Sequence, residues 1–484
     1  MGIVINQSIK NILITYVGFA IGAINVLFLF TKFLKPEYYG LITFILSTAN
    51  ILMPLMAFGV HNTIVKFYSS FKTRQSQNGF LSLMLILPLL IILPFALLIF
   101  FNLETISEFL AQKNLIVKEY TWYIFIAAIA FAYFEVFYAW SKVQLKSVFG
   151  NFMKEVFHRI SITFLLISLY YKLLTVNVLI ESIILVYIIR MLVMMFYAFS
   201  LKPPVLKLSK IKGLKPILKY TSLIIIAGSV ANIILEIDKF MIGQYVAIEN
   251  VAYYGVAIYI ATVVGVPSRS MHQITQPITA KLLNEKNILD LKVLYKKSSL
   301  NLLIVSGFIF LVIILNVNQL YNLLPKEYTG GFVVVLMIGL VKLFDNILGN
   351  NNSILFNSDY YRVILLLGVI LAICTALLNI IFIPQFGIKG AAYATCIAIF
   401  IYNTIKVLFV YTKFKILPFS VNTLKTLLLI LVCGVGFYFW EFKFHPLLNI
   451  ALKTLLIVGI YGIIVYRFNF SEDISALINK LLKR

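Results

Sequence analysis

The sequence predicts an all-α protein that crosses a membrane about fourteen times. Of its 484 residues, 61% are hydrophobic and 12% are charged, whereas an average soluble domain is roughly 45–50% apolar and about 25% charged. The apolar residues form runs of roughly 20, the length that spans a bilayer as a helix. Most connections between the runs are short, so the sequence leaves no room for a catalytic domain outside the membrane.

The runs define fourteen predicted spans, at 11–30, 40–59, 79–101, 118–140, 153–173, 177–199, 216–236, 251–271, 299–317, 330–350, 362–383, 389–411, 421–440 and 446–466. An even number places both termini on the same side of the membrane. Most basic residues then lie on that side, many of them in the linker at Lys202, Lys207, Lys210, Lys212, Lys215 and Lys219. Because cytoplasmic loops are enriched in Lys and Arg, we expect both termini in the cytoplasm.

The net charge of +23 has the sign expected of a nucleic-acid-binding protein, but its distribution excludes that class. The basic residues are dispersed among the apolar runs and do not form one patch. Cys374, Cys396 and Cys433 lie inside apolar runs, without the spacing of a zinc site or a disulfide framework. We therefore predict no nucleic-acid partner, no metal and no cofactor.

Short patterns recur along the chain at a nearly constant offset of about 210–216 residues. The matching pairs are Tyr38-Tyr39-Gly40 with Tyr253-Tyr254-Gly255, Lys66 with Lys281, Phe134-Glu135 with Phe344-Asp345, and Arg190 with Lys406. Their common order predicts two six-helix bundles duplicated in parallel, which is a transporter architecture. The predicted domains are an N-terminal bundle at 1–200, a basic cytoplasmic linker at 201–219, a C-terminal bundle at 220–415, and two additional helices with a cytoplasmic tail at 416–484.

Several local patterns point to one family of transporters. They are Tyr38-Tyr39-Gly40, Phe58-Gly59-Val60, Lys66-Phe67-Tyr68, Asp238 to Gly243 (DKFMIG), Val251 to Ala257 (VAYYGVA) and Pro384 to Ala392 (PQFGIKGAA). With six plus six plus two helices, the chain resembles the polysaccharide transporter family of the multidrug/oligosaccharidyl-lipid/polysaccharide exporter superfamily. The resemblance covers nearly the whole chain.

The resemblance implies a flippase of the bacterial cytoplasmic membrane and no enzymatic activity. Members of the family look like proteins that move undecaprenyl-pyrophosphate-linked oligosaccharides from the cytoplasmic to the outer leaflet by alternating access. The product would be O-antigen, capsule or exopolysaccharide. The implied partners are membrane lipids, a polysaccharide polymerase and a chain-length regulator, with H⁺ or Na⁺ as the coupling ion.

Basic residues inside the spans are candidates for binding an anionic headgroup. Arg190 lies about ten residues from the inner end of its span, roughly 15 Å deep, where snorkelling alone does not relieve the charge. Such a charge marks a functional site, and an arginine fork matches phosphate oxygens. The other candidates for a cationic cavity are Lys406, Arg159, Lys66 and Lys281. The alternatives are an internal ion pair for Arg190 and a topological role for the lysines.

Acidic residues inside the spans are candidates for ion coupling. Glu135 and Asp345 occupy equivalent positions of the repeat, and Asp238 lies at the outer end of its span. A buried carboxylate can exchange a proton across a gradient. Structural pairing is the alternative, with Lys342 three residues from Asp345 on the same helix face.

Three other functions are alternatives to the flippase, and a sequence feature counts against each. A multidrug antiporter of the same superfamily usually has twelve helices and an acidic first bundle, whereas the first two spans here carry no charge. A lipid II-type flippase shares the fourteen helices and the cationic cavity, but such proteins tend to carry arginines on those two spans. A membrane glycosyltransferase or polymerase needs a large outer loop or an acidic motif, and the loop at 102–117 offers only Glu104 and Glu108.

Overall fold

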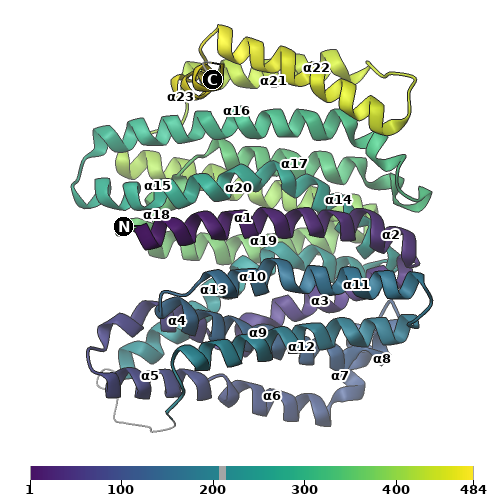
Figure 1. Cartoon of the computed structure of the whole chain (residues 1–484), viewed down its shortest axis with the longest axis vertical. Helices are drawn as coiled ribbons and strands as arrows, with labels where there is room; N and C mark the ends of the chain where they lie inside the picture. The colour runs from purple at the N-terminus through teal and green to yellow at the C-terminus, as the bar shows by residue number, and fades with distance from the viewer. Residues whose placement is uncertain (1, 206–213, 483–484) are drawn as a thin grey trace. The chain divides into compact units, whose positions relative to one another are not determined.

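The computed structural model describes residues 2–205 and 214–482, and within these ranges every regular element is a helix (Figure 1). Twelve helices of the described chain are long and apolar enough to cross a membrane. The other two predicted spans, 153–173 and 216–236, fall on the broken helix at 148–170 and on α13 (Leu214–Tyr245). The prediction of an all-α membrane protein with about fourteen transmembrane helices is confirmed. Lys207, Lys210 and Lys212 of the linker lie outside the described residues.

The chain divides into two compact units, Met1–Ala252 and Tyr253–Arg484. The helices of the first unit are α1 (Gly2–Ile24), η1 (Asn25–Leu29), α2 (Phe30–Phe33), α3 (Pro36–Met56), α4 (Val60–Phe67), η2 (Tyr68–Ser70), α5 (Arg74–Ile86), α6 (Leu89–Phe101), α7 (Leu103–Leu110), α8 (Ile116–Glu119), α9 (Thr121–Val143), α10 (Val148–Phe152), η3 (Met153–Phe157), α11 (His158–Tyr170), α12 (Val176–Leu201) and α13. Helix α14 (Glu249–Thr262) begins in the first unit and continues into the second.

The second unit holds the remaining helices. They are η4 (Val263–Gly265), α15 (Val266–Asn284), α16 (Ile288–Tyr321), η5 (Lys326–Gly331), α17 (Phe332–Ile347), α18 (Asn351–Asn357), α19 (Tyr361–Phe386), α20 (Ile388–Phe414), α21 (Val421–Tyr438), α22 (Pro446–Arg467) and α23 (Glu472–Leu482). Helix α13 packs on α3 and α4 and so belongs to the first unit. The boundary between the units lies within α14, after Ala252, while the division into duplicated bundles joined at 201–219 stays a prediction.

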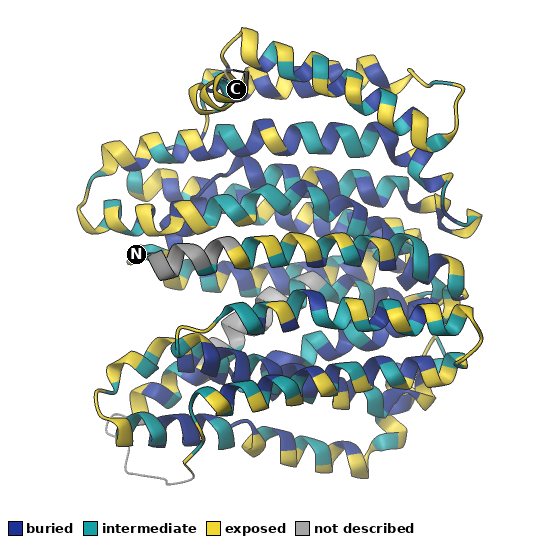
Figure 2. Ribbon diagram, viewed as in Figure 1, coloured by how far each residue is buried: buried dark blue, intermediate teal, exposed yellow. Residues whose placement is uncertain are grey.

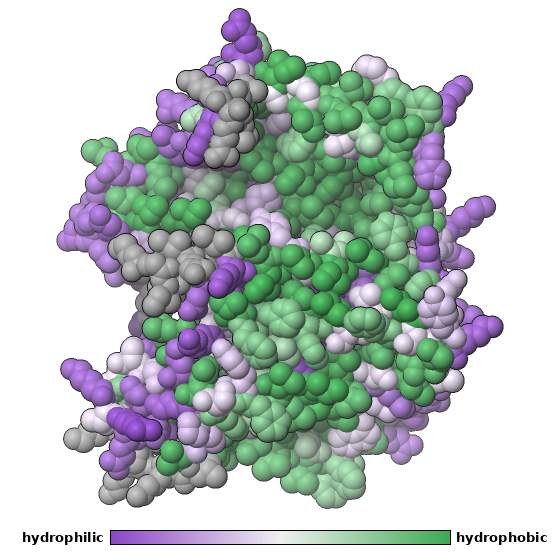
Figure 3. Space-filling view, in the orientation of Figure 1, coloured by the Kyte–Doolittle hydropathy of each residue, from purple (hydrophilic) through white to green (hydrophobic). Residues whose placement is uncertain are grey.

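The outer faces of the helices are apolar, as a lipid environment requires. In Figure 3, hydrophobic residues cover the middle of the helices and hydrophilic residues gather at their ends. Figure 2 shows many exposed residues on these same surfaces, and on α6 the side chains of Leu97, Phe100 and Phe101 are 58%, 66% and 77% exposed. Apolar side chains of this size are unfavourable in water but not against lipid tails.

Helix α9 is the central helix of the first unit and positions much of its polar chemistry. It packs against α3, α4 and α12, and most of its residues are buried. In the second unit, α17 lies between α16 and α20 in the same way. These two helices carry Glu135 and Asp345, which the repeat placed at equivalent positions.

Two membrane helices are interrupted at a glycine, one in each unit. Between α3 and α4, Phe58 and Gly59 adopt φ angles of 51° and 65°, a left-handed conformation that only glycine adopts at low cost. Between α14 and α15, the 3₁₀ turn η4 ends at Gly265. Interrupted segments in corresponding positions of two halves are a feature of transporter binding regions.

Asn25, in the π turn η1, joins the first span to the fifth. Asn25 of η1 is 3% exposed. Its Nδ2 donates to the backbone oxygen of Arg159 over 2.8 Å, and its Oδ1 accepts from Thr163 Oγ1 over 2.7 Å. These bonds fix the start of α11, where His158 and Arg159 lie.

The connection between α13 and α14 is clamped onto the first unit. Asn114 Nδ2 donates to the backbone oxygens of Gly243 and Val246 over 2.7 and 2.9 Å, and Asn114 Oδ1 accepts from the backbone nitrogen of Ile248 over 2.9 Å. Gly40 packs against the same connection, because a Cβ at this position would lie 2.0 Å from the oxygen of Ile248. Close packing is thus the physical role of the glycine in Tyr38-Tyr39-Gly40.

Candidate substrate and ion sites

Arg190 lies in the middle of α12 and is enclosed by aromatic rings. The hydroxyl of Thr175 caps this helix by accepting from the backbone nitrogen of Val178 over 3.4 Å, so the helix starts well before the buried arginine. Arg190 is 8% exposed, and its Cζ lies 4.2 Å from the ring centre of Phe134 and 4.8 Å from that of Tyr187. Contacts within about 6 Å of a ring stabilise a cation.

Arg190 has no carboxylate partner among the described residues. The two acidic side chains that act on it electrostatically, Glu135 and Glu155, are each bound by another cation. Lys154 Nζ lies 2.6 Å from Glu135 Oε1, and Arg159 Nη1 lies 3.2 Å from Glu155 Oε2. The Nε atom of Arg190 is buried without a hydrogen-bond partner. A buried, unpaired charge is unfavourable, and the internal ion pair that was the alternative for Arg190 is absent from the described residues.

His158 and Arg159 lie close to Arg190 at the start of α11. The rings of His158 and Tyr187 have centres 5.5 Å apart, and Arg159 and Arg190 both act electrostatically on His158. The structure therefore brings together two of the predicted cationic residues, Arg190 and Arg159, and adds His158 to them.

Three further predicted residues lie in α4, α15 and α13. Lys66 is exposed, with its Nζ 3.7 Å from the ring centre of Tyr220. Lys281 is exposed at the end of α15, 3.8 Å from Glu285 Oε1. Asp238 is buried in α13, at 3% exposure. The functional roles assigned to these three residues stay predictions.

A second polar cluster lies in the second unit, between α17, α18 and α20, where Asn403 and Lys406 are buried, Asp345 is half-buried and Asn352 is exposed. Asp345 accepts a hydrogen bond from Asn403 Nδ2 over 2.6 Å, and Lys406, at 3% exposure, donates to Asn352 Oδ1 over 3.0 Å. Within the described residues neither charge forms an ion pair, and the pairing of Asp345 with Lys342, the alternative to ion coupling, is absent. Asp345 is therefore held by a neutral amide, whereas Glu135 is bound to a lysine.

Two histidines accompany these carboxylates and were missed by the sequence analysis. His61 acts electrostatically on Glu135 in the first unit, and His272 lies within the electrostatic range of Asp345 and Lys406 in the second. They are separated by about 211 residues, close to the offset of the other repeat pairs. This offset could have identified both histidines from the sequence. Asn403 and Asn352 had no such signal, because neutral amides are common in helices.

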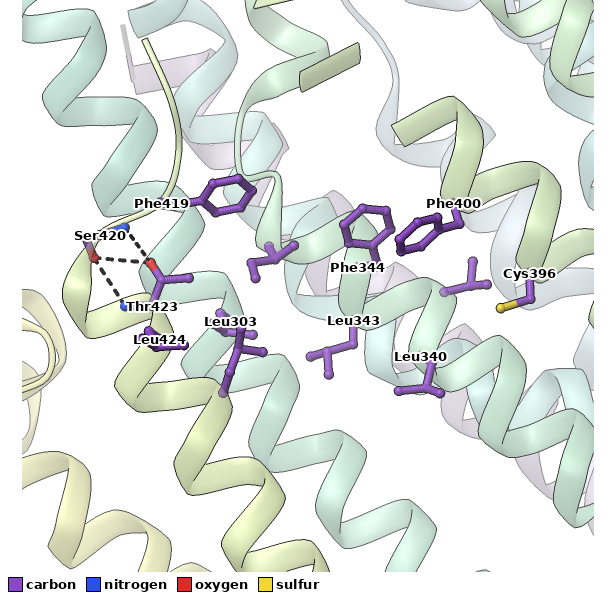
Figure 4. A pocket seen from close by; sticks show the side chains of 13 residues that line it. Leu303, Leu340, Leu343, Phe344, Cys396, Phe400, Phe419, Ser420, Thr423 and Leu424 are labelled. Carbon is purple, nitrogen blue, oxygen red and sulfur yellow. Dashed lines mark hydrogen bonds between the residues drawn. The ribbon is translucent and has the colours of Figure 1, made fainter. Parts of the chain in front are cut away.

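An apolar pocket of about 590 Å³ lies between α16, α17, α20 and α21 (Figure 4). Its lining residues are Leu303, Leu340, Val341, Leu343, Phe344, Ile347, Cys396, Phe400, Phe419, Ser420, Thr423, Leu424 and Leu427. Ser420 and Thr423 satisfy each other in a capping box at the start of α21, so they offer little to a polar ligand. The pocket suits an apolar chain.

Comparison with known families decides the classification. A model of the polysaccharide biosynthesis protein family matches residues 5–283, which is more than half of the chain. The chain belongs to this family. The matched part of the chain includes Arg190, Arg159 and Glu135, and the resemblance to polysaccharide transporters is confirmed. No curated protein matches the chain.

Solved structures share the fold of this polysaccharide biosynthesis protein. The lipid II flippase MurJ, in an inward closed conformation, aligns over 96% of this chain and 100% of its own, with a TM-score of 0.74 at 17% identity. A multidrug resistance MATE family transporter of the MOP superfamily, in an inward-facing conformation, aligns over 85% and 94%, with a TM-score of 0.61 at 13% identity. At these identities the similarity establishes the fold alone.

Proposed function

We propose that this polysaccharide biosynthesis protein is a flippase for undecaprenyl-pyrophosphate-linked oligosaccharides. It moves them by alternating access from the cytoplasmic to the outer leaflet of the bacterial cytoplasmic membrane, for the synthesis of a surface polysaccharide. The observation that carries the proposal is the buried, unpaired guanidinium of Arg190. A pyrophosphate has at least two negative charges, and its transfer into hydrocarbon is strongly unfavourable unless cations compensate them.

The other predicted basic residues would serve the same anion at different stages. Arg159 lies next to Arg190 and shares its electrostatic field. Lys66 and Lys281 are exposed and would capture the headgroup from the cytoplasmic side, while Lys406 would receive it in the second unit. The apolar pocket beside α21 has the lining that a segment of the polyprenyl chain requires.

A polysaccharide polymerase and a chain-length regulator are the expected partners, because the translocated unit must next be polymerised. Both termini would lie in the cytoplasm, as the distribution of Lys and Arg predicts.

The function is tested with the purified chain reconstituted in liposomes that contain a labelled undecaprenyl-pyrophosphate-linked oligosaccharide. The rate at which the label becomes accessible to a membrane-impermeant glycosidase should exceed that of protein-free liposomes. Liposomes with labelled lipid II and liposomes with a fluorescent cationic drug are run in parallel. Faster transport of lipid II or of the drug than of the oligosaccharide would assign the chain to another transporter class.

Ion coupling is proposed to use Asp345, Glu135 and Asp238, with H⁺ or Na⁺ as the ion. Asp345 is the strongest of these, because its charge is not neutralised by a cation in the described structure. The unpartnered, buried Oδ1 of Asn403 lies on the same amide that binds Asp345. A carboxylate and an amide oxygen are ligands that suit a small hard cation as well as a proton.

Asp345→Asn should flatten the dependence of the transport rate on pH or on Na⁺ concentration, because the variant can neither bind a proton at this position nor attract a cation by charge. Initial rates in liposomes are measured across a pH series at constant Na⁺ and across a Na⁺ series at constant pH. Glu135→Gln is the comparison, and it should also lower the thermal midpoint because it leaves Lys154 unpaired. If the transport rate of Asp345→Asn depended on pH and Na⁺ as the wild-type rate does, Asp345 would not be part of the coupling site.

A further inference from the structure

The cations around Tyr187 outnumber the carboxylates available to them. Three acidic side chains of the described chain act on this region, and each is bound by another cation, in the pairs Glu135–Lys154, Glu155–Arg159 and Glu236–Lys239. Glu135 and Glu155 act on Arg190, and Glu236 acts on Tyr187 from α13. Among the described residues, each carboxylate that acts on this site is therefore paired with another cation, and the charge of Arg190 has no acidic partner.

His158 is the second group at this place with an unused polar atom. Its Nδ1 is buried and has no hydrogen-bond partner, as is the case for Nε of Arg190. Both side chains contact the ring of Tyr187, His158 with a centre-to-centre distance of 5.5 Å and Arg190 with its Cζ 4.8 Å from the ring centre. Two buried nitrogen atoms without hydrogen-bond partners, one from α11 and one from α12, therefore belong to side chains that contact the same ring, and both can donate to an oxyanion when the imidazole is protonated.

Imidazole is the side chain whose charge changes near neutral pH. The guanidinium groups of Arg190 and Arg159 create a positive field at His158. An oxyanion bound to Arg190 reverses this field, because its negative charge favours the imidazolium form. Binding of the anion and protonation of His158 are therefore thermodynamically linked.

We propose that His158 takes up one proton from water when an oxyanion binds at Arg190, and that the anion and the proton enter and leave this site together. The proton forms an N–H bond on the imidazole and no other covalent bond changes. The proton is returned to water when the anion leaves. The identity of the natural anion, the pyrophosphate of a lipid-linked glycan, rests on the proposed function, while the linkage rests on the site itself.

The linkage is tested by binding of inorganic sulfate to the purified full chain in lipid nanodiscs. Sulfate is a suitable probe because it carries two negative charges and does not titrate near neutral pH. For the wild type, the Kd should rise between pH 6 and pH 8, by at most about tenfold per pH unit because one proton is linked. For His158→Gln the Kd should be the same at both values, and for Arg190→Ala sulfate binding should be lost at both.

His158→Lys provides the complementary variant, since a permanent charge should bind sulfate at pH 8 as tightly as at pH 6. His158→Asn replaces His158→Gln if the latter does not purify as a monodisperse protein. His445→Gln removes an exposed imidazole of the second unit and should behave as the wild type. A wild-type Kd that is independent of pH, or an unchanged pH dependence in His158→Gln, would overturn the linkage and leave the flippase proposal intact. If Arg190→Ala bound sulfate as tightly as the wild type, Arg190 would not be the anion site, and the flippase proposal would lose the observation that carries it.

Discussion

Arg190→Ala should lower the initial rate of oligosaccharide-lipid transport by about ten- to a hundredfold. The variant removes the buried guanidinium that compensates the charge of the pyrophosphate, and hydrogen bonds to charged groups contribute about 1.5–3 kcal/mol each. A difference of about 1.4 kcal/mol corresponds to a factor of ten. The rate is measured as the appearance of labelled lipid in the outer leaflet of liposomes, at equal amounts of reconstituted protein.

Two variants separate the charge from other effects of this substitution. Arg190→Lys keeps a positive charge but not the planar fork, and it should retain part of the activity. Arg362→Ala removes an exposed arginine at the start of α19 and should transport at the wild-type rate. Undiminished transport by a well-folded Arg190→Ala protein would show that the cationic-site mechanism is wrong.

Gly40→Ala should be among the most destabilising single-methyl changes in the chain. The added Cβ would lie 2.0 Å from the oxygen and 2.7 Å from the carbon of Ile248, both of them backbone atoms that Asn114 holds in place. No side chain can rotate away, so α3 or the clamped connection must move. Overpacking of this kind costs about 1–3 kcal/mol or more, and we expect the thermal midpoint of the purified protein to fall by several degrees.

Gly436→Ala is the matched control for Gly40→Ala. Gly436 lies in α21, and no atom lies within 4 Å of a Cβ built there. Alanine is the better helix former by about 0.8–1 kcal/mol, so its midpoint should stay the same or rise slightly. An equal fall in both variants would show that the approach of Gly40 to Ile248 is not the cause.

The helices were predictable because a bilayer imposes one simple rule, that about 20 consecutive residues must be apolar. The predicted span at 40–59 and the helix α3 (Pro36–Met56) illustrate the agreement. The interruptions within spans were not predictable in the same way. The turn at Phe58-Gly59 depends on packing, and the π turn η1 contains Asn25, which bonds to Arg159 in another helix; neither feature alters the hydropathy of its segment.

The charged members of the candidate site were predictable from depth alone, since an arginine at position 190 must lie inside the hydrocarbon. The partners of these charges were not. Glu135 and Asp345 occupy matching positions, yet one is bound by Lys154 and the other by Asn403. Both partners come from other helices of their unit, so only the folded chain determines which carboxylate keeps its charge exposed to an ion.

The π turns have a consequence for comparing this chain with its relatives. A π turn holds one residue more than an α-helical turn, and one residue rotates an α-helix by about 100°. The side chains after η1 and η3 therefore face about 100° away from the direction that an unbroken helix would give them. A relative without these turns would match the chain only with a one-residue gap in both helices. In an ungapped alignment, the residue opposite Arg159 would belong to a different face of the fifth span.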